Sequence, residues 1–184
     1  MFIIMEKIKS FTIDHMTLLP GVYVSREDRI GPAEAFGTPG TPSAPQQTSD
    51  EKQLYPVTTY DIRITRPNFE PVMSTGELHT IEHLGATWLR NNAAWKNRVL
   101  YWGPMGCRTG FYLILAGAVP VEAVRTLMLE AFSFIAAYEG DIPGASPAEC
   151  GNYSDMDLPA ARARAAGYAA LLRESASLPQ GTVL

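Results

Sequence analysis

The sequence predicts an α+β fold in which an antiparallel sheet packs against helices within a single domain. Strand-like and helix-like segments are mixed along the chain, and the gaps between them are of hairpin length. Such gaps favour an antiparallel sheet over a doubly wound fold. The length of 184 residues and the apolar share of 46% suit one domain with a core of its own, covering residues 1–184.

The first third of the chain is expected to hold short extended segments and a polar insert. Residues 8–25 are expected to form short extended segments. Residues 28–53 are rich in Pro and Gly and contain little that could pack, so we expect a surface insert rather than a second domain. Residues 60–65 alternate apolar and polar side chains, which predicts a half-buried strand that ends at Pro67.

The middle of the chain predicts a helix followed by a strand pair. Residues 78–92 are expected to be helical because Leu78, Ile81 and Trp88 recur at the spacing of one helix face. The segments that follow predict a strand, a tight turn and a buried strand, at residues 98–102, 103–107 and 110–118.

Two further helices are predicted in the last third. Residues 120–140 form a long, mostly apolar stretch with Pro120 at its start and Gly140 past its end, as helices often have. After a loop comes an alanine-rich amphipathic helix from Leu158, with Asp155 or Asp157 placed to cap it.

Composition and charge exclude several classes of protein. The net charge of -4 gives no electrostatic reason to expect nucleic acid or an anionic membrane as a partner. No apolar run approaches the roughly 18 residues that span a bilayer, and the first residues lack the basic region of a secretory signal. We therefore expect a cytoplasmic protein. Its two cysteines, Cys107 and Cys150, are then free, metal-bound or catalytic rather than disulfide-bonded.

The stretch "GELHTIEHLGATWLRNN" carries the strongest chemical signal. On a helix, His79 and His83 lie one turn apart on the same face, so both imidazoles can reach one metal ion. Glu82 lies beside them, where a carboxylate can act on bound water or substrate. The pattern H-x-x-E-H is the inverted form of the zinc-protease motif. The alternative is a pair of histidines on a solvated helix face.

A catalytic metal needs a third protein ligand. The candidates are His15, Cys107 and Cys150, and each cysteine has a glycine beside it that lets the backbone approach closely. A lone cysteine is more often a small buried apolar residue. Here, however, every histidine and cysteine falls in one of four short segments rich in Gly, Pro and polar residues, which favours a shared site.

Five motifs occur in one order: "SFTIDH", "YDIRITRPN", "LHTIEHL", "GPMGCRTGFYL" and "ECGNY". Together they resemble the S-ribosylhomocysteine lyase (LuxS) family, from about Ser10 to the C-terminal helix and apart from the insert. The resemblance implies cleavage of S-ribosylhomocysteine to homocysteine and 4,5-dihydroxy-2,3-pentanedione, the precursor of the quorum-sensing signal autoinducer-2. It also implies a homodimer whose active sites lie at the subunit interface. The reaction would serve the methyl cycle of methionine, in which homocysteine is recycled.

The same resemblance implies roles for individual residues. The ligands of an Fe2+ ion, which Zn2+ or Co2+ can replace, would be His79, His83 and Cys150. The two catalytic acid/base groups would be Cys107 and Glu82. Contacts to the ribose and to the homocysteine end of the substrate would come from Ser10, His15, Arg63 and Arg90. The chain departs from the family pattern near the amino acid end of the substrate, at Tyr101, Gly103 and Met156.

The chemistry of this reaction suits these residue types. A carbonyl must migrate along the sugar from C1 to C3, and each step removes one proton beside a carbonyl and returns another. That requires a Lewis acid and two proton carriers. With the ketone at C3, loss of the C4 proton expels homocysteine by β-elimination. A thiolate near a cation has a lowered pKa, so Cys107 can act as a base near neutral pH.

Other interpretations fit part of the same pattern. Inverted-motif metalloproteases use an acidic third ligand and a much longer chain. A structural zinc site could use His79, His83 and both cysteines, in which case four protein ligands would close it. A family member that binds a ligand without turnover is a further alternative. Arg63 could instead be a surface charge paired locally with Asp61 on the same strand face, and Arg90 could simply cap its helix.

Overall fold

The computed structural model describes residues 13–31 and 54–174 of the chain. In these ranges the strands are β1 (Gly21–Ile30), β2 (Tyr55–Arg63), β3 (Val99–Pro104) and β4 (Gly110–Ala116). The helices are α1 (Thr75–Asn91), α2 (Val121–Ala137) and α3 (Leu158–Glu174), with a short 3-10 turn, η4 (Tyr153–Asp155), before α3.

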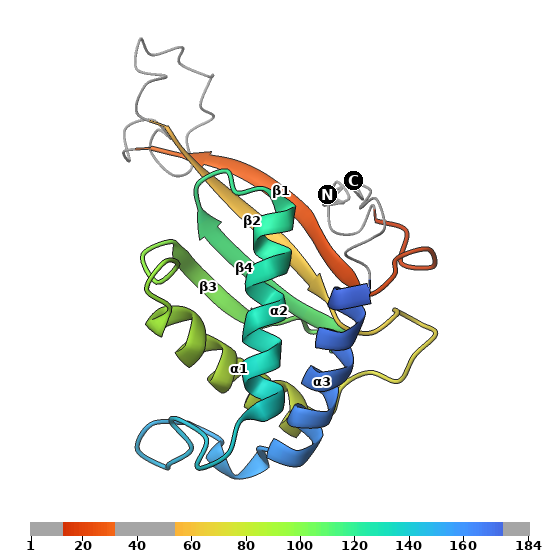
Figure 1. The fold of residues 1–184 in the computed structure, drawn as a ribbon, viewed down its shortest axis with the longest axis vertical. Coiled ribbons are helices and arrows are strands. Elements are labelled where there is room, and N and C mark those ends of the chain that lie inside the picture. Colours follow the sequence, from red (N-terminus) through yellow and green to blue (C-terminus); the bar gives the residue numbers. More distant parts are fainter. Residues whose placement is uncertain (1–12, 32–53, 175–184) are drawn as a thin grey trace, which may run out of the picture.

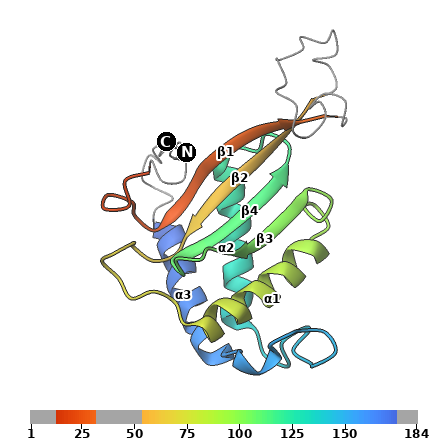
Figure 2. The same ribbon diagram turned by 180° about the vertical axis from the view of Figure 1, so that it is seen from behind.

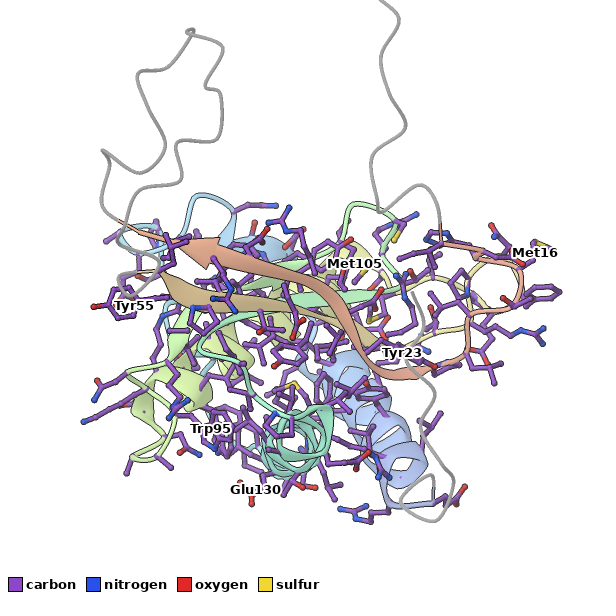
Figure 3. The ribbon with its side chains drawn as sticks, turned by 90° about the horizontal axis from the view of Figure 1, so that it is seen from above. Met16, Tyr23, Tyr55, Trp95, Met105 and Glu130 are labelled. Atoms are coloured by element: carbon purple, nitrogen blue, oxygen red, sulfur yellow. The ribbon has the colours of Figure 1, made fainter. Side chains whose placement is uncertain are left out.

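The four strands form one antiparallel sheet in the order β1-β2-β4-β3. The three helices all pack on one face of this sheet (Figures 1 and 2). Seen from above, the sheet forms one layer and the helices the other, with Met105 at the level of the sheet and Glu130 on the helix side (Figure 3). The predicted α+β fold with an antiparallel sheet is therefore confirmed. None of the described helices combines the length and the apolar character needed to cross a membrane.

The core fills the space between the sheet and the helices. Tyr60 and Ile62 of β2 and Phe111 of β4 point into it and are fully buried, as the alternation along residues 60–65 predicts. Trp102 of β3 stacks on Phe111, with ring centroids 4.6 Å apart. This layer fixes the inner face of α1, and with it the direction in which the outer residues of that helix point.

The strand β2 is more buried than its sequence suggests. The alternation predicts a half-buried strand, but every residue from Val57 to Arg63 is buried, including Asp61 and Arg63 on the face that points away from the helices. The reason is its central position, since β1 and β4 flank it on either side. Tyr23 and Tyr112 lie in register with Asp61 on these neighbouring strands and help to cover it.

The predicted insert overlaps the end of β1. Residues 28–30 lie in β1 and pair with Val57, Pro56 and Tyr55, although the sequence predicts that the insert begins at residue 28. β1 is an edge strand that pairs on one side only, and polar residues suit such a strand. Their polarity is also typical of a loop, so the sequence predicts one here. The rest of the predicted insert, residues 32–53, lies outside the described residues.

The helix α1 begins three residues earlier than its apolar spacing indicates. Ser74 caps it: the Ser74 hydroxyl accepts from the backbone N–H of Glu77, and the Glu77 carboxylate accepts from the backbone N–H of Ser74. This capping box starts the helix one turn ahead of its first apolar residue. For α3, the cap is Asp157, whose carboxylate accepts from the backbone N–H of Ala160. Asp155, the other candidate, has a different partner.

Candidate active site

The helix α1 holds two of the three members of a candidate metal centre. Leu78 and Ile81 anchor its inner face in the core, which leaves His79 and His83 half-buried on the adjoining face. Their rings are 4.8 Å apart between centroids. The loop between α2 and α3 adds Cys150, and the ligand atoms of the three residues all lie within 4.8 Å of one another. The structure therefore brings together the three residues predicted as metal ligands.

Both imidazole rings are held so that Nε2 is the nitrogen left to bind a metal. His79 Nδ1 lies 2.7 Å from Asp155 Oδ1, and His83 Nδ1 lies 2.7 Å from the Pro143 carbonyl oxygen. Carboxylate and carbonyl oxygens accept hydrogen bonds, so each Nδ1 carries the proton. Cys150 Sγ lies 3.2 Å from His79 Nε2. Two oriented imidazoles and one thiol form a donor set that fits Zn2+, Fe2+ or Co2+.

The loop that carries Cys150 is fixed on α1 by backbone contacts. Gly76, in the first turn of α1, has no side chain, and a Cβ there would overlap the carbonyl oxygen of Asp155. The backbone N–H of Asp157 donates to Thr80 Oγ1 at 2.9 Å and approaches the Gly76 carbonyl oxygen at 3.3 Å. Further back in the loop, Gly144 adopts φ +76 and packs against the ring of His83. The first three turns of α1 therefore hold both the histidines and the loop that completes the group.

Glu82 follows on the same helix, directly before His83, and is half-buried. Within the part of the chain that the structure describes, its carboxylate has no hydrogen bond or ion pair. A carboxylate without a partner beside a metal group is free to exchange protons with a bound molecule.

A second group of reactive side chains surrounds Cys107. Arg63 is 2% exposed and binds the carboxylate of Asp61 through two hydrogen bonds, of 3.1 Å from Nε and 2.5 Å from Nη2. Its Nη1 donates to Thr109 Oγ1 at 2.5 Å and lies 3.8 Å from Cys107 Sγ. Cys107 Sγ is itself 3.0 Å from Thr109 Oγ1. Arg63 is therefore not the surface charge that its strand position allowed, although its pairing with Asp61 is present.

This environment favours the thiolate of Cys107. Burial raises the pKa of the thiol, but hydrogen bonds with Thr109 and the nearby charge of Arg63 outweigh burial and bring it below its ordinary value. Burial also raises the pKa of Asp61 above its ordinary value, against the lowering effect of Arg63. For Arg63, burial lowers the pKa and Asp61 raises it by more, so the guanidinium stays charged. A fixed cation beside an accessible thiol is the arrangement that makes a cysteine reactive at neutral pH.

The turn that presents Cys107 is fixed to the end of β2. The backbone N–H groups of Ile64 and Thr65 both donate to the carbonyl oxygen of Thr109, and Met105 N–H donates to the Gly110 carbonyl oxygen. The tight turn predicted for residues 103–107 lies further along, because β3 continues to Pro104. Cys107 stands exposed on this turn.

The other predicted residues are not all placed with these two groups. His15 is half-buried, its ring hydrogen-bonded to the carbonyl oxygen of Ile13, and it lies near enough to lower the pKa of Asp61. Arg90 is exposed in the last turn of α1, about 16 Å along the helix axis from His79. Ser10 lies outside the described residues.

Cys107 does not join the group of His79, His83 and Cys150 among the described residues. A closed structural site with four ligands from these residues is therefore not what the fold builds. Three protein ligands leave room for a further ligand, which is the arrangement of catalytic sites.

The departures from the family pattern lie partly on the outer face of the sheet. Tyr101 is 46% exposed, and its phenol ring lies over Gly103, in the space that a side chain at position 103 would need. Gly103 pairs with Tyr112, which belongs to the same sheet face as Asp61. The phenol of Tyr101 therefore requires a residue without a side chain at position 103.

Two residues of these groups, Thr109 and Asp155, have roles that the sequence does not predict. Thr109 stands two residues after Cys107, but nothing in its spacing indicates that it bridges Cys107 to Arg63. For Asp155 the sequence predicts only a helix cap, because its contact with His79 joins residues 76 positions apart.

Comparison with known proteins gives a consistent result. The family model described as S-Ribosylhomocysteinase (LuxS) matches residues 43–177. Among curated proteins, the S-ribosylhomocysteine lyase of Clostridium beijerinckii is 51% identical over 86% of each chain. The enzyme of Phocaeicola vulgatus is 46% identical over 89% of this chain and 88% of its own. The enzyme of Borrelia garinii subsp. bavariensis is 44% identical over 91% of this chain and 93% of its own.

Proposed function

The chain belongs to the S-ribosylhomocysteinase (LuxS) family and is a carbon–sulfur lyase that cleaves S-ribosylhomocysteine, and we propose how its residues perform this reaction. In the proposal, His79, His83 and Cys150 hold a divalent metal, and Cys107 and Glu82 move protons on the sugar. The observation that carries it is the group of two oriented imidazoles and one thiol, which offers three ligands and leaves a position open.

We propose Fe2+ as the resident ion, with Zn2+ or Co2+ able to replace it. The mixture of two imidazoles and one thiolate suits all three ions. When bound, the metal supplies Lewis-acid polarisation of the carbonyl and hydroxyl oxygens of the substrate.

The proton transfers fall to Cys107 and Glu82. Moving the carbonyl from C1 to C3 requires two rounds in which a proton leaves a carbon beside the carbonyl and another is delivered to its neighbour. The Cys107 thiolate is favoured by Thr109 and Arg63, and the Glu82 carboxylate has no partner among the described residues, so each can accept a proton and return it. Removal of the C4 proton then breaks the C5–S bond and expels homocysteine as a thiolate. The enol left between C4 and C5 takes up a proton at C5 and loses its hydroxyl proton to give 4,5-dihydroxy-2,3-pentanedione.

Binding of the substrate is assigned to four residues. Arg63 contacts Cys107, and His15 lies near Asp61, the partner of Arg63, which supports contacts of both with the ribose. Ser10 is proposed as a further contact to the ribose. Arg90, exposed on α1 at a distance from the histidines, is proposed to hold the homocysteine end. We further propose that the protein works in the cytoplasm, that homocysteine returns to the methyl cycle and that the second product is the precursor of the quorum-sensing signal autoinducer-2.

The test of the activity is the release of a thiol. Protein purified without oxygen and loaded with Fe2+ is expected to release homocysteine from S-ribosylhomocysteine, as followed with a thiol reagent. The same preparation stripped with a chelator should lose this activity and regain it when metal is returned. Release at the same rate from stripped protein would contradict the metal-dependent mechanism, and no release from metal-loaded protein would favour a non-catalytic member of the family.

We also propose a homodimer whose two sites lie at the subunit interface. The metal ligands lie on the helical layer, whereas Cys107 contacts Arg63 on the strand face that points away from the helices. In a symmetric dimer, the Cys107 group of one chain would face the metal ligands of the other. The symmetry would then form two such sites.

Mixing two inactive variants tests the shared site. Cys107→Ala keeps the metal ligands and Cys150→Ser keeps the reactive thiol, so each alone is expected to be inactive. Co-expressed in equal amounts, half of the dimers are mixed, and each mixed dimer has one intact site of two. We therefore expect recovery of about a quarter of the wild-type activity. No recovery, although mixed dimers have formed, would place all the catalytic groups within one chain.

A further inference from the structure

Asp155 makes a contact that its position before a helix does not explain. It lies in the 3-10 turn η4, and the cap of α3 is supplied by Asp157 instead. The carboxylate of Asp155 turns the other way and accepts a hydrogen bond of 2.7 Å from Nδ1 of His79, 76 residues earlier in the chain. The side chain of Asp155 is 32% exposed and that of His79 is 19% exposed.

The contact settles which nitrogen of His79 faces the candidate metal centre. With Nδ1 bound to a carboxylate, the lone pair is on Nε2, which lies 3.2 Å from Cys150 Sγ. His83 is oriented in the same sense, but by a neutral carbonyl oxygen, that of Pro143. His79 thus has a charged partner that makes its ring a stronger donor, and His83 has none.

We propose that Asp155 is a positioning residue of the metal centre, which holds the ring of His79 with Nε2 directed at the ion and thereby sets the affinity for the metal. The proposal rests on the function assigned above, because it presupposes that His79, His83 and Cys150 bind a metal. It adds a fourth residue to the metal centre, one that is neither a ligand nor a proton carrier.

The role in positioning can be separated from a role in holding the loop. The segment that contains Asp155 is attached to α1 by its backbone: its carbonyl oxygen packs on Gly76, and the N–H of Asp157 donates to Thr80 Oγ1. None of these contacts uses the Asp155 carboxylate. Removing the carboxylate should therefore leave the loop, and Cys150 with it, in place.

The test compares Co2+ affinity in four proteins by competition with a chelator, using the absorption of the Co2+–thiolate centre as the readout. Relative to wild type, Asp155→Ala is expected to bind Co2+ about 10- to 100-fold more weakly. Asp155→Asn should lose less, because its amide oxygen can still accept from Nδ1. Asp157→Asn is the matched control: it removes the same charge from the same segment, keeps a good helix cap and should leave the affinity unchanged.

The melting temperature of the metal-free protein completes the experiment. It should be the same in wild type and Asp155→Ala, as expected for a residue that acts on the metal through His79. Equal Co2+ affinities in wild type and Asp155→Ala would overturn the inference alone. A weaker affinity accompanied by a clearly lower melting temperature, without rescue by Asp155→Asn, would also overturn it in favour of a structural role. Failure of the wild-type protein to bind Co2+ would overturn the metal centre itself, and the inference with it.

Discussion

Replacing Cys107 by alanine is expected to lower the turnover of S-ribosylhomocysteine by about 10²- to 10⁴-fold, the range lost when a general acid/base group is removed. The side chain is exposed on its turn, and its thiol contacts Thr109 and Arg63 rather than the core. The loss should therefore be catalytic and not a consequence of unfolding. Homocysteine release under saturating substrate measures it directly.

Metal binding provides the control for this variant. Cys107 is not a member of the group of His79, His83 and Cys150, so Cys107→Ala should bind metal as the wild type does and give the same Co2+–thiolate absorption. Cys150→Ser should behave in the opposite way and lose that absorption together with the activity. A Cys107→Ala protein that turns over at the wild-type rate would contradict the assigned role. One that loses its metal would move Cys107 into the ligand set.

The local chemistry of the metal ligands could be predicted from the sequence. His79 and His83 are four residues apart on one helix, and helical geometry alone brings them together. For the third ligand, by contrast, His15, Cys107 and Cys150 are all candidates from the residues alone, and only the resemblance to a known family singles out Cys150. Spacing cannot decide between them, because the placement of Cys150 depends on how the loop after α2 returns to Gly76 and Thr80.

The environment of Cys107 could not be predicted in the same way. Alternation along β2 indicates a strand with one solvent-exposed face, but β2 lies in the centre of the sheet and Asp61 and Arg63 are buried. Strand order is a property of the whole sheet and leaves no mark on the residues of one strand. The start of α1 is a different case, because Ser74 and Glu77 form the S-x-x-E pattern of a capping box, which the sequence contains but apolar spacing alone does not use.

The buried pair of Asp61 and Arg63 leads to the second large effect. Arg63→Met removes the cation and leaves the Asp61 carboxylate buried without its partner, at 3% exposure. Breaking a buried pair in this way costs about 3–5 kcal/mol in the free energy of unfolding. The double variant Asp61→Asn/Arg63→Met removes both charges and should recover most of that loss, because no uncompensated charge stays in the interior. Urea unfolding of the three proteins measures the difference.

The same variants are expected to shift the pH at which Cys107 becomes reactive. Arg63 is one of the groups that lower the pKa of this thiol, so its loss must raise the pKa and reduce the thiolate fraction at neutral pH. Alkylation of Cys107 by iodoacetamide should then reach half of its maximal rate at a higher pH than in the wild type. The shift should be largest in Arg63→Met, where the carboxylate of Asp61 is left unopposed, and smaller in the double variant.

The effects on stability and on thiol reactivity can be separated. The double variant should restore most of the free energy of unfolding, but it should not fully restore the pH profile of Cys107 alkylation. Alkylation is measured with metal bound, so that Cys150 is protected, and the Cys107→Ala protein gives the background. An unchanged pH profile in Arg63→Met, with the variant folded, would show that Thr109 alone governs the thiol. The homocysteine-release rate should follow the alkylation profile on its acidic side, since the thiolate is the species that takes the proton from the sugar. A release profile that does not move with the alkylation profile would assign the rate-limiting proton transfer to Glu82 instead.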